Sequence, residues 1–119
     1  MARRTTGTTV RFWPDARYFD APKFSVPRLK HVLRAKAVLC PGLKVSFSDE
    51  ASGEQIIWHY QDGFTDYLRE ALGQTVLLPD PPFVGHVSSA HEAADWALTW
   101  LPEGGEPVME SYVNLIPTP

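Results

Sequence analysis

The chain has 119 residues, of which 44% are hydrophobic and 21% charged, so it has the composition of a globular protein and intrinsic disorder is excluded. Its net charge of −3 does not indicate a basic surface for binding nucleic acid. No apolar run approaches the roughly 18 residues that span a bilayer. The single cysteine, Cys40, excludes an intrachain disulfide and fits a reducing, cytoplasmic setting.

The first predicted element is a strand over residues 7–13. Thr8, Val10 and Phe12 alternate there with a second set of good strand formers, which is the two-residue period of a strand. Pro14 ends the pattern. Thr8 and Val10 are therefore expected to project to the same face.

A helix of about 12 residues is predicted next, because apolar residues recur at helical spacing from Val26 to Leu39. Ser25 is the expected N-cap, and Pro27 is tolerated in the first turn. The helix should end near residues 40–42, where a proline and a glycine follow one another.

A hairpin and a second helix are predicted in the middle of the chain. The hairpin joins strands over residues 43–48 and 55–60 through a turn at 49–53. Asp62 is the expected cap of the second helix, which ends at Gly73. Its buried side carries four large apolar residues, Phe64, Tyr67, Leu68 and Leu72.

The last third is less regular. A stiff, proline-rich connector is expected over 78–82, a strand over 83–88 and a last strand over 111–116. Residues 90–101 are ambiguous, because local composition slightly favours a helix whereas Trp96, Leu98 and Trp100 alternate as in a strand. The best candidate for a domain boundary is residues 61–63.

Reactive residues do not converge on a site in the sequence. The chain has no glycine-rich phosphate loop and no cysteine pair for zinc. Cys40 follows a helix C-terminus, where the dipole disfavours a thiolate. The four histidines are scattered and fit ordinary surface positions: His31, His59, His86 and His91. The residues alone therefore predict a soluble α+β chain without a self-contained active site.

Several sequence blocks nevertheless resemble one family. The run TGTTVRFWPD at 6–15 is similar to a characteristic strand of the B subunits of bacterial type IIA DNA topoisomerases. The blocks LRAKAVLCPG at 33–42, WALTWLPEGG at 96–105 and ESYVNLIPT at 110–118 continue the resemblance in order, and they are closer to topoisomerase IV than to gyrase. The resemblance covers essentially residues 5–119.

The resemblance implies a fold and two site residues. Residues 1–62 correspond to the C-terminal part of a GHKL-type ATP-binding domain, and 63–119 to the N-terminal part of a transducer domain similar to domain 2 of ribosomal protein S5. It also implies a strand at 90–101, which we adopt. Thr8 matches the threonine of the network that reads the adenine amino group, and Val10 matches an apolar residue lining that pocket.

The family's function and partners are implied in the same way. Such B subunits use ATP and Mg²⁺ to drive DNA strand passage, decatenation and relaxation, together with the topoisomerase IV A subunit, DNA and a second B subunit. The family's metal ligand, general base and phosphate contacts would lie outside these 119 residues. The chain alone is therefore expected to bind no cofactor and to be inactive. The alternative is a non-enzymatic module that self-associates through uncovered sheet edges.

Overall fold

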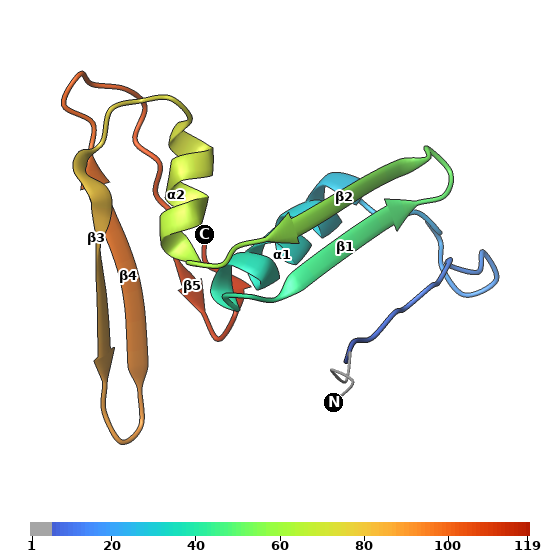
Figure 1. Ribbon diagram of the computed structural model, residues 1–119. Helices are drawn as coiled ribbons and strands as arrows, with labels where there is room; N and C mark the ends of the chain where they lie inside the picture. The colour runs from blue at the N-terminus through green and yellow to red at the C-terminus, as the bar shows by residue number, and fades with distance from the viewer. Residues whose placement is uncertain (1–5) are drawn as a thin grey trace, which may run out of the picture.

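The computed structural model describes residues 6–119 and confirms the α+β class (Figure 1). Its strands form three separate two-stranded antiparallel sheets, β1–β2, β3–β4 and β5–β6. Neither helix of the described part is long and apolar enough to cross a membrane. In chain order the elements are α1 (Val26–Leu39), β1 (Lys44–Asp49), β2 (Glu54–His59), α2 (Phe64–Leu72), β3 (Leu78–Ser88), β4 (Ala93–Trp100), β5 (Tyr112–Val113) and β6 (Ile116–Pro117).

The first unit is α1 packed against one face of the β1–β2 hairpin. The helix and the hairpin were both predicted from the sequence, whereas their packing was not. Val45 pairs with Trp58 across the two strands, and these half-buried side chains pack against the core. The centre of this core is Val38 of α1, whose side chain is only 1% exposed. Alternation along each strand thus places one apolar face toward the helix.

The helix ends differ slightly from expectation. Ser25 is the N-cap of α1, as predicted, but its side chain makes no capping hydrogen bond. Gly63, not Asp62, is the N-cap of α2, and the Asp62 backbone N–H donates to the Asp66 carboxylate at 2.9 Å. Gly73 ends α2 with a φ of 61°, a conformation that favours glycine.

The β3–β4 hairpin settles the ambiguous segment as a strand. The local preference for a helix over 90–101 is wrong, because β4 pairs with β3 from Ser88↔Ala93 to Phe83↔Leu98. Backbone pairing and cross-strand contacts override helix propensity here. The expected connector at 78–82 is also part of β3, with a register irregularity between Leu78 and Phe83.

The predicted strand over 7–13 is not formed. These residues have no ladder partner among residues 6–119, and they run as a non-regular segment with Val10 74% and Trp13 73% exposed. A strand is stabilised by its neighbours, so an alternating pattern alone does not create one.

The predicted single strand over 111–116 is likewise wrong. It is a tight hairpin of two short strands, β5 and β6, which turn at Asn114 and Leu115 with φ of 50° and 67°. Two consecutive left-handed residues are the geometry of a type I′ turn.

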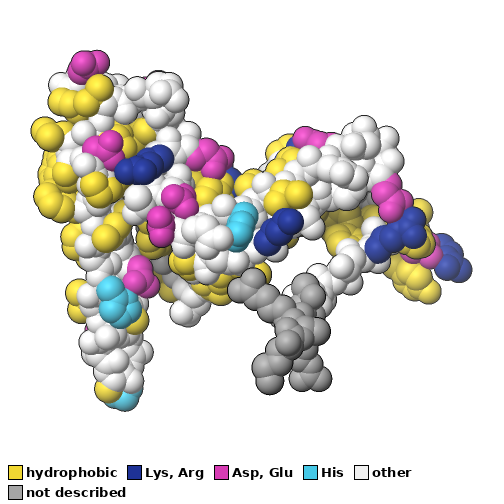
Figure 2. Space-filling model, in the orientation of Figure 1, with side chains coloured by type: hydrophobic (Ala, Val, Ile, Leu, Met, Phe, Trp, Pro, Cys, Tyr) yellow, Lys and Arg dark blue, Asp and Glu magenta, His cyan; other side chains and the backbone are white. Residues whose placement is uncertain are grey.

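The elements are loosely assembled. The β1–β2 and β3–β4 hairpins project on opposite sides of a centre that holds the two helices and β5–β6 (Figure 1). The radius of gyration is 17.7 Å, whereas a compact domain of this length has one of about 13.5 Å. Hydrophobic side chains are visible along the β3–β4 hairpin (Figure 2). The described part is therefore an open arrangement with a small core.

Candidate functional site

The predicted adenine-pocket residues lie in the extended segment near the N-terminus. Thr8 and Val10 are both exposed, and the described residues do not enclose them in a pocket. The Arg11 guanidinium of this segment contacts Glu50 at the tip of the β1–β2 hairpin at 2.8 Å and 2.9 Å, and the Phe12 ring meets the Phe24 ring edge to face. This contact lowers the pKa of the Glu50 carboxyl through the hydrogen bond and the charge of Arg11.

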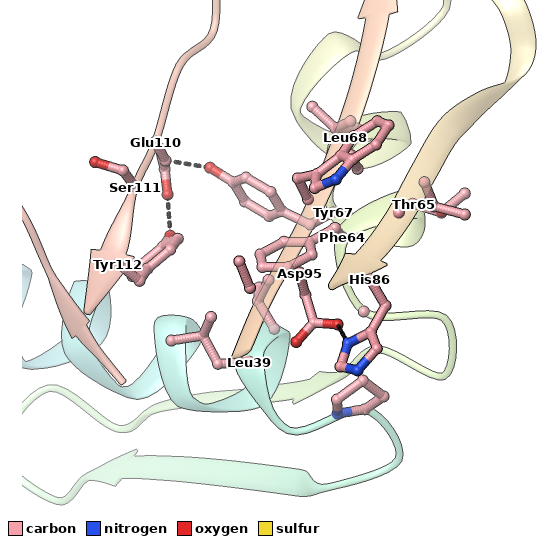
Figure 3. Close-up of a pocket in the computed structure, with 18 of the residues that line it drawn as sticks. Leu39, Phe64, Thr65, Tyr67, Leu68, His86, Asp95, Glu110, Ser111 and Tyr112 are labelled. Carbon is pink, nitrogen blue, oxygen red and sulfur yellow. Dashed lines mark hydrogen bonds and ion pairs between the residues drawn. The ribbon is translucent and has the colours of Figure 1, made fainter. Parts of the chain in front are cut away.

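The described residues form an open groove of about 1150 Å³ that the sequence did not reveal (Figure 3). It lies between the C-terminal end of α1, α2, the β3–β4 hairpin and residues 108–115. Phe64 and Leu68 of α2 and Trp96 of β4 contribute apolar surface, and Glu110 contributes charge. No sequence signal marks this groove, because its walls come from four separate parts of the chain.

Glu110 is the centre of a polar cluster at one wall of the groove (Figure 3). The Tyr67 hydroxyl donates to one carboxylate oxygen and the Tyr112 hydroxyl donates to the other. The Arg34 guanidinium lies 3.6 Å from the same carboxylate and also covers the Tyr67 ring, 5.2 Å from its centroid. Three elements therefore meet at one side chain.

The surroundings of Glu110 determine the protonation states of its carboxyl group and of the two tyrosine hydroxyls that bind it. Burial disfavours the charged form of Glu110, but the hydrogen bonds from Tyr112 and Tyr67 and the charge of Arg34 outweigh it, so its pKa lies below the ordinary value. Burial, with the hydrogen bond to Glu110, raises the pKa of Tyr67 to about 12. At neutral pH the carboxylate is an acceptor and both phenols are donors.

Tyr60 lies beside this cluster without joining it. Its ring meets the Tyr67 ring edge to face, with centroids 6.2 Å apart. Its hydroxyl is buried and makes no hydrogen bond within residues 6–119, although the Glu70 carboxylate lies near enough to act on its pKa. Burial, together with Glu70, raises the pKa of Tyr60 above its ordinary range.

The histidines fit the surface role that the sequence predicts for them. His86 of β3 faces Asp95 of β4 at 2.6 Å, but both side chains are about 60% exposed. Such an exposed cross-strand pair supports the hairpin weakly. Across the described part of the chain, no group of three or more metal-ligating side chains converges.

Sequence comparisons identify relatives over nearly the whole chain, although no family model matches it. The chain is 60% identical over 118 residues to the B subunit of DNA topoisomerase 4 from Pseudomonas aeruginosa, in a match that covers 99% of the chain and 19% of that protein. It is 59% identical over 116 residues to the Escherichia coli protein of the same name, covering 98% of the chain and 18% of the relative. The chain thus spans about a fifth of the length of these relatives.

Solved structures give the same answer for the fold. The chain superposes with a TM-score of 0.74 on the B-subunit of DNA gyrase from Myxococcus xanthus, at 30% identity over 88% of this chain and 30% of that one. It superposes with a TM-score of 0.62 on the topoisomerase IV ATP binding domain of Francisella tularensis, at 37% identity over 90% and 28%. The fold is therefore that of a segment of the GHKL-type ATPase region of type IIA topoisomerase B subunits.

The sequence identity to one member of this class is high over almost the whole chain. At 59–60% identity over almost every residue, the chain matches a segment of the B subunits of bacterial topoisomerase IV, and the resemblance predicted from the sequence is confirmed.

Proposed function

We propose that the chain works as part of the ATPase region of a topoisomerase IV B subunit, in a cytoplasmic enzyme that uses ATP to pass one DNA duplex through another. The observation that carries this proposal is the 60% identity over 118 residues to the P. aeruginosa protein. The similarity to a solved domain described as ATP binding supports the use of ATP.

We assign two domains within the chain. Residues 1–62 form the C-terminal part of the ATP-binding domain, and residues 63–119 form the N-terminal part of the transducer. The packing of α1 with β1–β2 before residue 62, and of α2 with β3–β4 after it, supports this division, while one small cluster that includes Val38, Tyr60 and Tyr67 crosses it. The partners of the assembled enzyme in this proposal are DNA, the topoisomerase IV A subunit, which is a different polypeptide, and a second B subunit.

In this proposal, Thr8 and Val10 form one wall of the adenine pocket. Both are exposed on an extended segment and so are free to face a nucleotide. The proposal assigns the ligands of Mg²⁺ and the contacts to the phosphates to other parts of the B subunit, since residues 6–119 contain no metal-ligating group of three. The 119-residue chain by itself is then expected not to hydrolyse ATP.

A chimeric B subunit tests the proposal directly. In the P. aeruginosa protein, the matching 118 residues are replaced by this chain, and the product is combined with the A subunit of the same enzyme. We expect ATP-dependent decatenation of DNA at a rate within about threefold of the parent, since a change of that size corresponds to only about 0.7 kcal/mol. A folded chimera that assembles with its partner polypeptide yet does not use ATP would refute the proposal.

Two neighbouring threonines provide a matched pair for the adenine pocket. In the chimera, Thr8→Ala should weaken ATP binding about three- to tenfold, the usual effect of losing one hydrogen bond. Thr9→Ala is the control, because adjacent side chains of an extended chain point in opposite directions. Equal effects of the two substitutions on the KM for ATP would remove Thr8 from the pocket.

Self-association remains a second candidate for the chain on its own. One face of the β3–β4 hairpin carries large apolar side chains that are about half exposed, including Phe83 at 54%, Leu98 at 47% and Trp100 at 55%. Light scattering should show oligomers that Leu98→Lys reduces. Ile57→Lys, at a comparably exposed site on β2, is the control and should leave the mass unchanged. A monomer at high micromolar concentration would exclude this candidate.

A further inference from the structure

Glu110 lies where three separate parts of the chain meet. Arg34 comes from the middle of α1, Tyr67 from α2, and Tyr112 from β5. Figure 3 shows the carboxylate between the two tyrosine hydroxyls. Hydrogen bonds to a charged acceptor are stronger than neutral ones, so this side chain is a strong point of attachment.

A second contact fixes the far end of the same hairpin. The Lys36 ammonium group of α1 donates to the backbone carbonyl of Leu115, at the turn between β5 and β6. Leu115 has a φ of 67°, which a side chain of its size disfavours. A hairpin of two-residue strands is not stable in isolation. Its contacts with the helices therefore maintain residues 111–118 in this form.

We propose that Glu110 is a positioning residue that clasps the hairpin of residues 111–118 across α1 and α2. While the clasp is closed, the unit of α1 with β1–β2 and the unit of α2 with β3–β4 move as one body. When it opens, the hairpin leaves α1, and the two units are joined mainly by the small core around Val38 and Tyr67. This mechanical part goes beyond the proposed function, and only its link to ATP use rests on that function.

Hydrogen exchange in the 119-residue chain tests the clasp. Glu110→Ala should speed exchange of the Thr118 amide, which donates to the Ser111 carbonyl at 2.8 Å, by about tenfold or more, as expected when a hydrogen bond to a charged group is lost. Amides of β1–β2 should not change. Glu106→Ala is the matched control, since Glu106 is an exposed carboxylate on the same connecting segment.

The outcomes separate a clasp from a general contribution to folding. Unchanged exchange at Thr118, an equal effect of Glu106→Ala, or an equal acceleration in β1–β2 would each overturn the proposal. Tyr112→Phe provides a milder variant, because it removes one hydrogen bond and keeps the ring. It should give a smaller acceleration in the same amides, whereas no acceleration would count against the clasp.

The chimera tests whether the clasp transmits the effect of ATP. Glu110→Ala should reduce the number of DNA passages per ATP hydrolysed at least about threefold, with the KM for ATP unchanged, since the residue lies outside the proposed adenine pocket. An unchanged ratio would overturn the link to ATP use. An inactive chimera with Glu110 intact would instead refute the proposed function, and the exchange experiment would still decide the clasp.

Discussion

Tyr60 and Tyr67 lie in the same small core, and replacing either tyrosine with phenylalanine removes a single oxygen atom. The two rings are in edge-to-face contact, and the two residues are 5% and 7% exposed. The two residues differ in the hydrogen bonding of their hydroxyls. The Tyr67 hydroxyl donates to Glu110, whereas the Tyr60 hydroxyl is buried without a partner among the described residues. We therefore expect Tyr60→Phe and Tyr67→Phe to change stability in opposite directions.

The magnitudes follow from the two environments. A buried hydroxyl without a hydrogen bond costs about 1–3 kcal/mol, so Tyr60→Phe should stabilise the chain by about 1 kcal/mol or more. A hydrogen bond to a charged group contributes about 1.5–3 kcal/mol, and Tyr67→Phe should destabilise the chain by about that amount. The two variants should thus differ by about 3 kcal/mol in the free energy of unfolding.

Urea unfolding followed by circular dichroism measures both variants under the same conditions. With a slope of about 1–3 kcal/mol per molar, the two midpoints should separate by about 1 M or more, with the wild-type midpoint between them. The double variant shows whether the adjacent rings couple. Two destabilised variants would mean that the Tyr60 hydroxyl has a partner, and the reasoning from its burial would then be refuted.

Three further predictions concern the same structure. In the folded chain the pKa of Glu110 lies below its ordinary value of 4.5, so the ionised carboxylate stabilises the fold above pH 4.5. This stabilisation is lost as the pH falls through the lower, folded-state pKa. Melting temperatures measured over this pH range should therefore fall less steeply for Glu110→Gln than for the wild type. An added Cβ at Gly85 would lie 2.2 Å from the Trp96 ring, so Gly85→Ala should shift the Trp96 indole resonance and cost about 1 kcal/mol, unless Trp96→Ala is present as well. Val38→Ala should destabilise the chain by about 1–3 kcal/mol in urea unfolding, whereas Val113→Ala, at a site 61% exposed, should have an effect of at most about 0.5 kcal/mol.

The sequence was sufficient to predict those elements in which the local pattern of apolar residues agrees with the local packing. The helix after Ser25 and the hairpin formed by β1 and β2 were predicted almost to the residue, because each buries its apolar face against a neighbour in the chain. Gly73 ends α2 as expected, since its left-handed φ favours a residue without a Cβ. The topoisomerase IV resemblance was also present in the sequence and is confirmed by relatives that are 59% and 60% identical.

Only the tertiary structure decided the elements that depend on distant partners. Residues 93–100 form a strand because β3 pairs with them, although the composition of residues 90–101 favours a helix. Residues 7–13 have the pattern of a strand but no partner within the described part, so they do not form one. The clasp at Glu110 joins residues 34, 67 and 112, and no local spacing relates them. Periodicity thus determines which face of an element is apolar, whereas pairing and burial determine whether that element forms and what it joins.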